Sequence, residues 1–171
     1  NSVADVLCGN ATPSGKLPMT FPVDMYDHDS ARNFPVDAEV PLSFTQDASG
    51  RKDRKDIDYV IYEEGIYVGY RWFDKKNMKV SYPFGHGLSY TTFEYTEPSI
   101  EAGKKETTIN VTIRNTGNYP GKEVIQLYVS APEGKLDKPV KELKAFAKTR
   151  ELKPGESETV SMTVRNEDLA S

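Results

Sequence analysis

The chain has 171 residues, of which 37% are hydrophobic and 28% are charged, a composition typical of a globular protein. Its 22 basic and 26 acidic residues leave a net charge of −4, which argues against nucleic acid or an anionic membrane as a partner. No apolar run approaches the roughly 20 residues that cross a bilayer, so we expect no membrane span.

The first residues are expected to form the end of a helix. Residues 2–7 place apolar side chains on one side, and Gly9 follows as a terminator. A helix this short is not stable by itself, so we expect it to be the tail of a longer structure. Cys8, the only cysteine, lies in the same apolar run, where we expect a buried, inert thiol.

A short strand is expected next, because apolar residues alternate between positions 17 and 21. Pro18 and Pro22 favour a position at the edge of a sheet. Residues 24–58 are polar and irregular, and a structureless segment of this length is usually functional or disordered. We expect an extended excursion that is mobile in its second half.

An aromatic-rich segment follows. Residues 59–93 carry ten of the chain's 18 aromatic residues, and glycines interrupt them at four positions. A buried aromatic side chain removes roughly 150–250 Å² from water, so most of these rings must pack against something. Glycine allows close approach of the backbone, and we therefore expect a tightly packed connector that includes a strand or a helical turn at residues 66–70.

The remainder of the chain has an all-β pattern that ends in a helical turn at residues 166–169. Short strands separated by turns are typical of a β-sandwich of the fibronectin-III or immunoglobulin type, so the expected fold class is mainly β. About seven strands complete such a sandwich, so five leave an open edge through which we expect self-association. The five expected strands are residues 93–99, 107–114, 123–130, 140–148 and 157–164.

Three segments resemble the C-terminal part of glycoside hydrolase family 3. The end of that family's α/β sandwich domain is similar to residues 3–22, VADVLCGNATPSGKLPMTFP. The aromatic segment resembles the family in EEGIYVGYRWFD at residues 63–74 and YPFGHGLSYTTFEY at residues 82–95. The family's fibronectin-III-like domain is similar to residues 122–146, KEVIQLYVSAPEGKLDKPVKELKAF.

This resemblance implies three regions. Residues 1–58 would be the C-terminal remnant of the α/β sandwich domain, residues 59–92 a connector between domains, and residues 93–171 a fibronectin-III-like sandwich. In the family, two further strands follow the fifth one. The last strands of the sandwich are therefore expected to be missing from this chain or to come from another chain.

The resemblance also implies a function. Enzymes of the family that act as β-glucosidases hydrolyse terminal, non-reducing β-linked sugars with retention, and need no metal or organic cofactor. Their nucleophilic Asp belongs to an N-terminal barrel and their acid/base Glu lies earlier in the sandwich domain, and neither motif occurs in this sequence. We therefore expect no catalytic residue here and an inactive isolated chain. Its expected partners are the rest of the hydrolase and a β-linked oligosaccharide or glycoside, in a periplasmic or secreted location.

The candidate substrate-binding residues are Trp72, Phe84 and His86. The rings of Trp72 and Phe84 could stack on a pyranose ring, although packing between domains is the interpretation we favour. His86 lies between two glycines, near a sugar site or as a satisfied buried imidazole, and we favour the second. The adjacent Glu63 and Glu64 would diverge on a strand, so they make a poor acid/base pair.

Two other readings of the chain stay open. A metal site at residues 27–29 is a weak hypothesis, because three consecutive ligands on a loop are rarely a site, and we expect a polar surface there and no metal. A fibronectin-III-like module could also bind carbohydrate or protein without catalysis, or serve only as a spacer. Binding of cello-oligosaccharides or laminari-oligosaccharides would separate these alternatives from the enzyme part.

Overall fold

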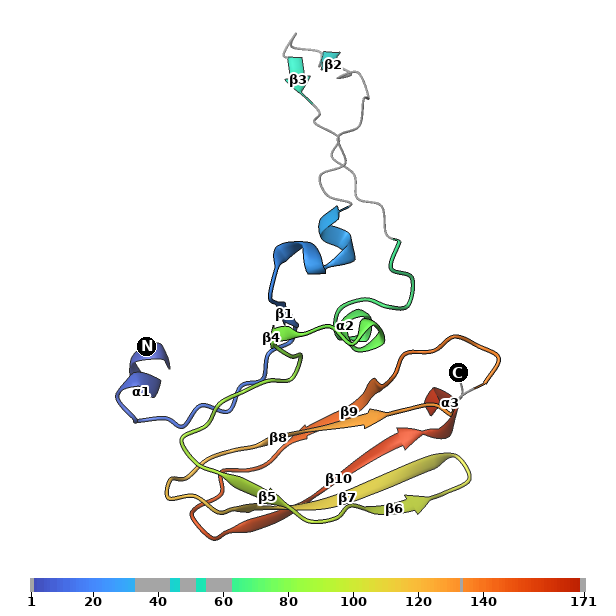
Figure 1. Cartoon of the computed structure of the whole chain (residues 1–171). Coiled ribbons are helices and arrows are strands. Elements are labelled where there is room, and N and C mark those ends of the chain that lie inside the picture. The colour runs from blue at the N-terminus through green and yellow to red at the C-terminus, as the bar shows by residue number, and fades with distance from the viewer. Residues whose placement is uncertain (1, 33–43, 47–51, 55–62, 133, 170–171) are drawn as a thin grey trace.

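The computed structural model describes residues 2–32, 44–46, 52–54, 63–132 and 134–169 (Figure 1). This part of the chain is mainly β, which confirms the expected fold class. A β-sandwich occupies its C-terminal half, and a smaller group of helices and short strands lies to one side of it, above it in the view of Figure 1. None of the described helices is long and apolar enough to cross a membrane.

The sandwich has two antiparallel sheets. In the first sheet, the central strand pairs along one edge with the last strand, and along its other edge with two short strands in succession. The second sheet consists of the remaining two strands. The first sheet contains β5 (Phe93–Tyr95), β6 (Ser99–Ala102), β7 (Glu106–Asn115) and β10 (Ser157–Arg165), and the second contains β8 (Val124–Val129) and β9 (Glu142–Lys148).

One expected strand is two strands in the structure. The prediction joined residues 93–99, whereas β5 ends at Tyr95 and β6 begins at Ser99. Pro98 falls in the gap and has no backbone N–H to donate, which explains the interruption. The sandwich therefore has six strands among the described residues, and the helical turn expected after β10 is the short helix α3 (Asn166–Leu169).

The core lies between the two sheets. Side chains alternate across a strand, so every second residue of β7 and β10 points inward. Ile113 of β7 and Leu152, which precedes β10, are fully buried. The other buried members of this cluster are Val111, Ile125, Val160 and Met162.

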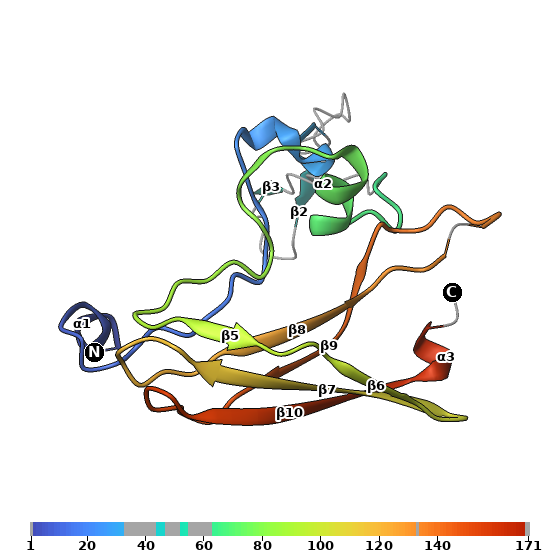
Figure 2. The same cartoon turned by 60° about the horizontal axis from the view of Figure 1, so that its bottom comes forward.

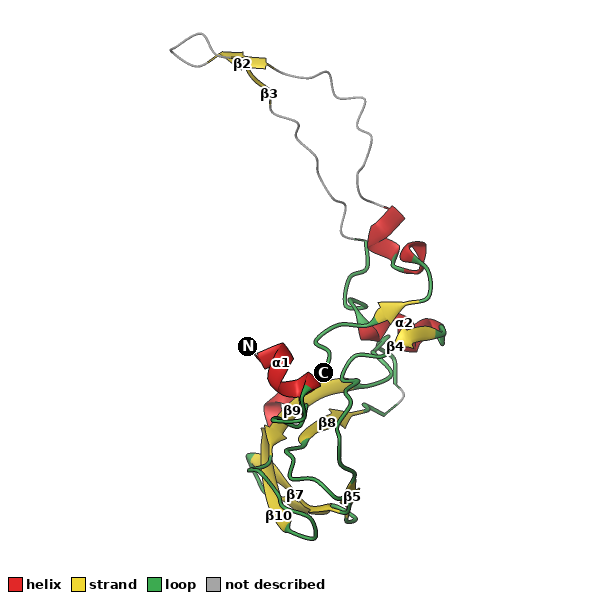
Figure 3. Ribbon diagram, turned by 90° about the vertical axis from the view of Figure 1, so that its left-hand side faces the viewer, coloured by secondary structure: helices red, strands yellow, loops and turns green. Residues whose placement is uncertain are grey.

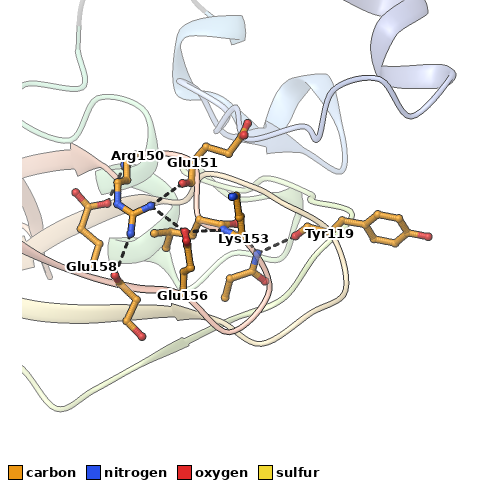
Figure 4. Close-up of polar contacts among 9 residues, drawn as sticks. Tyr119, Arg150, Glu151, Lys153, Glu156 and Glu158 are labelled. Carbon is orange, nitrogen blue, oxygen red and sulfur yellow. Dashed lines mark hydrogen bonds and ion pairs between the residues drawn. The ribbon is translucent and has the colours of Figure 1, made fainter.

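A polar turn precedes β10 at residues 153–156. Gly155 has a φ of +82° there, which glycine adopts without strain. The Glu156 carboxylate accepts hydrogen bonds from Lys153 N (3.0 Å) and Arg150 Nη1 (2.9 Å) (Figure 4). These two bonds hold the pKa of Glu156 below its usual value, and Arg150 N also donates to Glu158 Oε2 (2.8 Å) (Figure 4).

The N-terminal helix α1 (Ser2–Leu7) and its terminator Gly9, with a φ of +77°, are as predicted. The expectation that Cys8 is buried is wrong, because its thiol is exposed. The cause is that α1 buries no residue in the described structure, and its apolar residues Val3 and Leu7 are 75% and 78% exposed.

The strand expected at residues 17–21 is shorter in the structure. Only β1 (Phe21–Pro22) forms, and it pairs with β4 (Val80–Tyr82). Leu17 nevertheless exchanges backbone hydrogen bonds with the later segment, since Leu17 N donates to His86 O and Gly85 N donates to Leu17 O, both at 2.8 Å. Pro18 and Pro22 lack the N–H groups that a longer ladder would need.

Residues 24–58 contain more structure than the sequence suggests. Two 3₁₀-helices, η1 (Met25–Asp27) and η2 (Asp29–Arg32), follow β1, and the pair β2 (Phe44–Gln46) and β3 (Lys52–Arg54) forms a small antiparallel ladder. Most of the expected excursion lies outside the described residues, and so does its expected mobility.

The aromatic segment forms a helix, α2 (Tyr70–Lys76). Residues 66–69, where the sequence favours a strand or a helical turn, lie outside any strand or helix, and α2 begins only at the last residue of the expected range 66–70. The helix ends at Asn77, which has a φ of 49°, and Asn77 N donates to Asp74 O. A left-handed residue at this position is a common way to end a helix. Figure 3 shows α2 and β4 between the sandwich and the two 3₁₀-helices.

Candidate functional site

Helix α2 lies beside the segment that joins β8 to β9 (Figure 2). Four residues of α2, at positions 70, 71, 74 and 75, share one face because residues four apart on a helix are neighbours. Tyr70 Oη accepts a hydrogen bond from Leu143 N (2.8 Å), and Arg71 Nη2 lies 3.0 Å from Glu142 Oε1. One face of α2 is therefore in direct polar contact with the sandwich.

The same face carries two further ion pairs. Asp74 Oδ2 lies 3.4 Å from Lys141 Nζ, and Lys75 Nζ donates to Asp137 Oδ1. The hydrogen bonds that the Lys75 ammonium makes to Asp137 and Tyr67 raise the pKa of Lys75, and the hydrogen bonds that Asp137 makes with Lys75 and Tyr67 lower the pKa of Asp137. Both side chains of the second pair are more than a third exposed, so it contributes little to stability.

A second set of contacts joins the N-terminal segment to the sandwich. Glu123, 9% exposed, accepts hydrogen bonds from Lys16 Nζ and Tyr95 Oη, both at 2.8 Å. Burial, followed by the hydrogen bond to Glu123, raises the pKa of the Tyr95 phenol. Thr12 Oγ1 also donates to Pro120 O (2.6 Å), so residues 12–16 are fixed to the start of β8.

Trp72 and His86, two of the three candidate substrate-binding residues, have partners within the aromatic segment and its neighbours. Trp72 Nε1 donates to Asp27 O (3.1 Å), and the Lys76 ammonium lies 4.8 Å from the Trp72 ring centroid. The His86 ring centroid lies 5.1 Å from that of Tyr82. The structure thus gives each of the two a packing role beside any contact with substrate.

Phe84 occupies a different position from the other two candidates. Its ring centroid lies 4.9 Å from that of Tyr70, whose own centroid is 5.9 Å from that of Tyr128 on β8. Phe84 lines a cavity of about 260 Å³ between α2 and β8. The structure therefore does not bring Trp72, Phe84 and His86 together around this cavity, since it is lined by Thr20, Tyr70, Phe73, Asp74, Met78, Val80, Pro83, Phe84, Gln126, Tyr128 and Lys141.

Several polar residues of the cavity were missed by sequence reasoning. Asp74 lies on α2, Gln126 on β8, and Lys141 just before β9. Nothing in the local pattern relates them, because their proximity depends on how α2 packs on the sandwich. A second cavity, of about 340 Å³, lies next to the first and shares Thr20, Tyr70 and Phe84 with it.

The weak metal hypothesis concerned residues 27–29. The His28 ring packs edge-on against Phe73, with ring centroids 4.9 Å apart. Within the described ranges, no group of three His, Cys, Asp or Glu side chains is placed to hold a metal ion.

Two family models match the chain. The glycosyl hydrolase family 3 C-terminal domain matches residues 1–70, and the fibronectin type III-like domain matches residues 123–171. The chain belongs to glycoside hydrolase family 3 and corresponds to a C-terminal part of the family's proteins. This confirms the resemblance that the three sequence segments indicated.

Relatives of this family 3 segment match nearly all of it. β-Glucosidase A of Butyrivibrio fibrisolvens is 43% identical over 99% of the chain and 20% of that protein. Thermostable β-glucosidase B of Acetivibrio thermocellus is 41% identical over 95% of the chain and 20% of that protein. The chain therefore spans about a fifth of the length of the curated relatives it matches.

Solved structures of the family have the same arrangement. The structure of β-glucosidase 3B from Thermotoga neapolitana in complex with glucose has a TM-score of 0.83 and 46% identity, over 98% of this chain and 21% of that chain. The β-glucosidase from Kluyveromyces marxianus in complex with glucose has a TM-score of 0.81 and 38% identity, over 98% of this chain and 18% of that chain.

Proposed function

We propose that this chain is the non-catalytic C-terminal portion of a β-glucosidase-like hydrolase. The parent enzyme would hydrolyse terminal, non-reducing β-D-glycosides with retention, and its catalytic carboxylates would lie outside this chain. The names of the relatives support this proposal, since those reported above are all β-glucosidases. A secreted or periplasmic location is part of the same proposal.

The role of the chain would be to hold its N-terminal segment and the connector in one orientation on the sandwich. The observation that carries this role is the polar face of α2. Its residues at positions 70, 71, 74 and 75, on two successive turns of the helix, each contact a residue between 137 and 143. Aromatic packing of Tyr70 on Tyr128 adds to these polar contacts. In this proposal, Trp72 and His86 stabilise the connector. The connector, held in a fixed position, would help to shape the substrate entrance of the parent enzyme.

Two assays test the proposal. The purified chain should not hydrolyse an aryl β-glucoside, whereas the longer protein that contains it should, and turnover by the chain alone would contradict the assignment of the carboxylates. In the longer protein, Arg71→Ala and Glu142→Ala should each lower thermal stability, and the double variant should lose less than the sum of both. Additive losses would show that the contact between α2 and β9 does not hold the connector in place.

A further inference from the structure

The cavity between α2 and β8 has aromatic walls. Rings of Tyr70, Phe73, Phe84 and Tyr128 line it, and Phe73 is only 3% exposed. Its volume of about 260 Å³ is slightly below the roughly 300–1,000 Å³ of pockets for drug-sized molecules, so it suits one small ring.

Polar groups with unused hydrogen-bonding capacity lie between these rings. Thr20 is 5% exposed, and its Oγ1 has no hydrogen-bond partner within the described part of the chain. Asp74 Oδ2 is likewise buried without a hydrogen bond there, and its ion pair with Lys141 is long, at 3.4 Å. Buried polar atoms are nearly always satisfied, so a pair of such atoms in one cavity calls for a partner.

The polar side chains that line the cavity include both hydrogen-bond donors and hydrogen-bond acceptors. Asp74 accepts, Lys141 donates, and the hydroxyl of Thr20 can do either. Tyr128 Oη already donates to Gln126 Oε1 (3.1 Å), which leaves the Gln126 amide N–H groups for another acceptor. A ligand that satisfies this set must itself carry several groups that both donate and accept.

We infer that this cavity binds a neutral pyranose ring. Its apolar face would lie against the aromatic walls, and its hydroxyls would bond to Thr20, Asp74 and Lys141. An apolar ligand would leave these groups unsatisfied, and an anionic ligand would face the Asp74 carboxylate. The inference uses only contacts within this chain, so it does not rest on the activity proposed for the parent enzyme.

A titration of the 171-residue chain with methyl β-D-glucopyranoside tests the inference. Chemical shifts of the Thr20 methyl group and the Tyr128 ring should move together and saturate, with a Kd on the order of 1–10 mM for so small a ligand. Cyclohexanol has the same ring size and a single hydroxyl, and it should bind at least about tenfold more weakly. No saturation, or equal affinity for cyclohexanol, would overturn the inference.

Matched variants locate the site. Thr20→Val and Asp74→Asn keep the shape of each side chain, and each should weaken binding by about three- to tenfold. Thr163→Val on β10 and Asp168→Asn on α3 lie away from the cavity and should leave binding unchanged. Because Thr20→Val removes an unsatisfied buried hydroxyl, it should not lower thermal stability, which separates lost binding from lost folding. Unchanged binding in both cavity variants would refute the site.

Discussion

Lys16 donates a 2.8 Å hydrogen bond to the carboxylate of Glu123, although 107 residues separate them in the sequence. The side chains of Lys16 and Glu123 are only 19% and 11% exposed, so solvent screens the pair weakly. Glu123→Gln keeps the shape of the side chain and removes its charge. We expect it to lower the free energy of unfolding by about 1–3 kcal/mol, since Lys16 loses its counter-charge in a partly buried place.

Urea denaturation with a tryptophan or circular-dichroism signal measures this loss. Asp168→Asn is the matched control, because it breaks an ion pair with Arg165 whose side chains are 62% and 45% exposed. An exposed pair contributes about 0.2–1 kcal/mol, so the control should change little. Equal losses for both variants would show that the Lys16–Glu123 pair has no special role.

The Tyr95 phenol should make stability fall at alkaline pH. Burial and the hydrogen bond to Glu123 raise its pKa in the folded state above the value of about 10 in the unfolded chain. Its stabilising effect is therefore fully present below about pH 10 and is lost as the pH rises through the folded-state pKa. Tyr95→Phe should flatten the decline in unfolding free energy above about pH 10, whereas Tyr119→Phe, at an exposed tyrosine, should not.

Asn115 should be among the least replaceable residues of the sandwich. It is fully buried, its Nδ2 donates to Tyr119 O (2.7 Å) and Leu152 O (2.8 Å), and its Oδ1 accepts from Thr91 Oγ1 (2.6 Å) and Gly117 N (3.0 Å). Asn115→Ala removes the hydrogen bonds to all four partners, and we expect the free energy of unfolding to fall by about 3–4 kcal/mol.

The control for Asn115→Ala is Asn118→Ala in the same turn, where the side chain is exposed. That variant should change the unfolding free energy by less than about 0.5 kcal/mol. Thermal denaturation of the two variants in parallel gives the comparison, and a small effect at position 115 would contradict the structural role assigned to its amide.

Gly85 should not accept a side chain. Its φ is +80°, and a Cβ atom there would lie 2.1 Å from Gln126 Oε1. Gly85→Ala should lower the free energy of unfolding by about 2–3 kcal/mol, because the positive φ is strained for alanine and because the added Cβ clashes with Gln126. Combining it with Gln126→Ala should recover only the part that is due to the clash. Gly15→Ala, where a Cβ would meet nothing within 4 Å, should be nearly neutral, and thermal melts of the four proteins test the set.

Self-association of the chain is a further expectation. Among the strands that the structure describes, β8 pairs with β9 alone, and Phe146 on β9 is 72% exposed. An unpaired strand edge and an exposed apolar ring both favour association. Light scattering should show an average mass that rises with concentration, and Phe146→Lys should reduce it. A monomer at every concentration would contradict this expectation.

Local sequence patterns were sufficient for most strands and for the terminal helices. The pattern of short strands separated by turns identified β10, and Gly9 marked the end of α1. They were insufficient for α2, whose aromatic residues have low helix propensity and whose contacts with the sandwich lie more than 60 residues away in the sequence.

The candidate site was harder to predict for the same reason. Phe84 was identified because an aromatic ring that could stack on a pyranose is visible in the sequence. Glu123 appeared only as the first residue of a strand, and its burial depends on Lys16 and Tyr95, which come from other parts of the chain. The cavity combines α2, β8 and the residue before β9, so no single segment could reveal it.

The bonds of Thr12 to Pro120 and of Lys16 to Glu123 also set an order of events during translation. They connect residues 108 and 107 positions apart, so neither can form until the start of β8 has been synthesised. At about 5–20 residues per second, the ribosome needs roughly 5–20 s to add that length of chain. For that interval the newly made N-terminal segment has neither partner, and protection of that segment by a chaperone would matter most before β8 emerges.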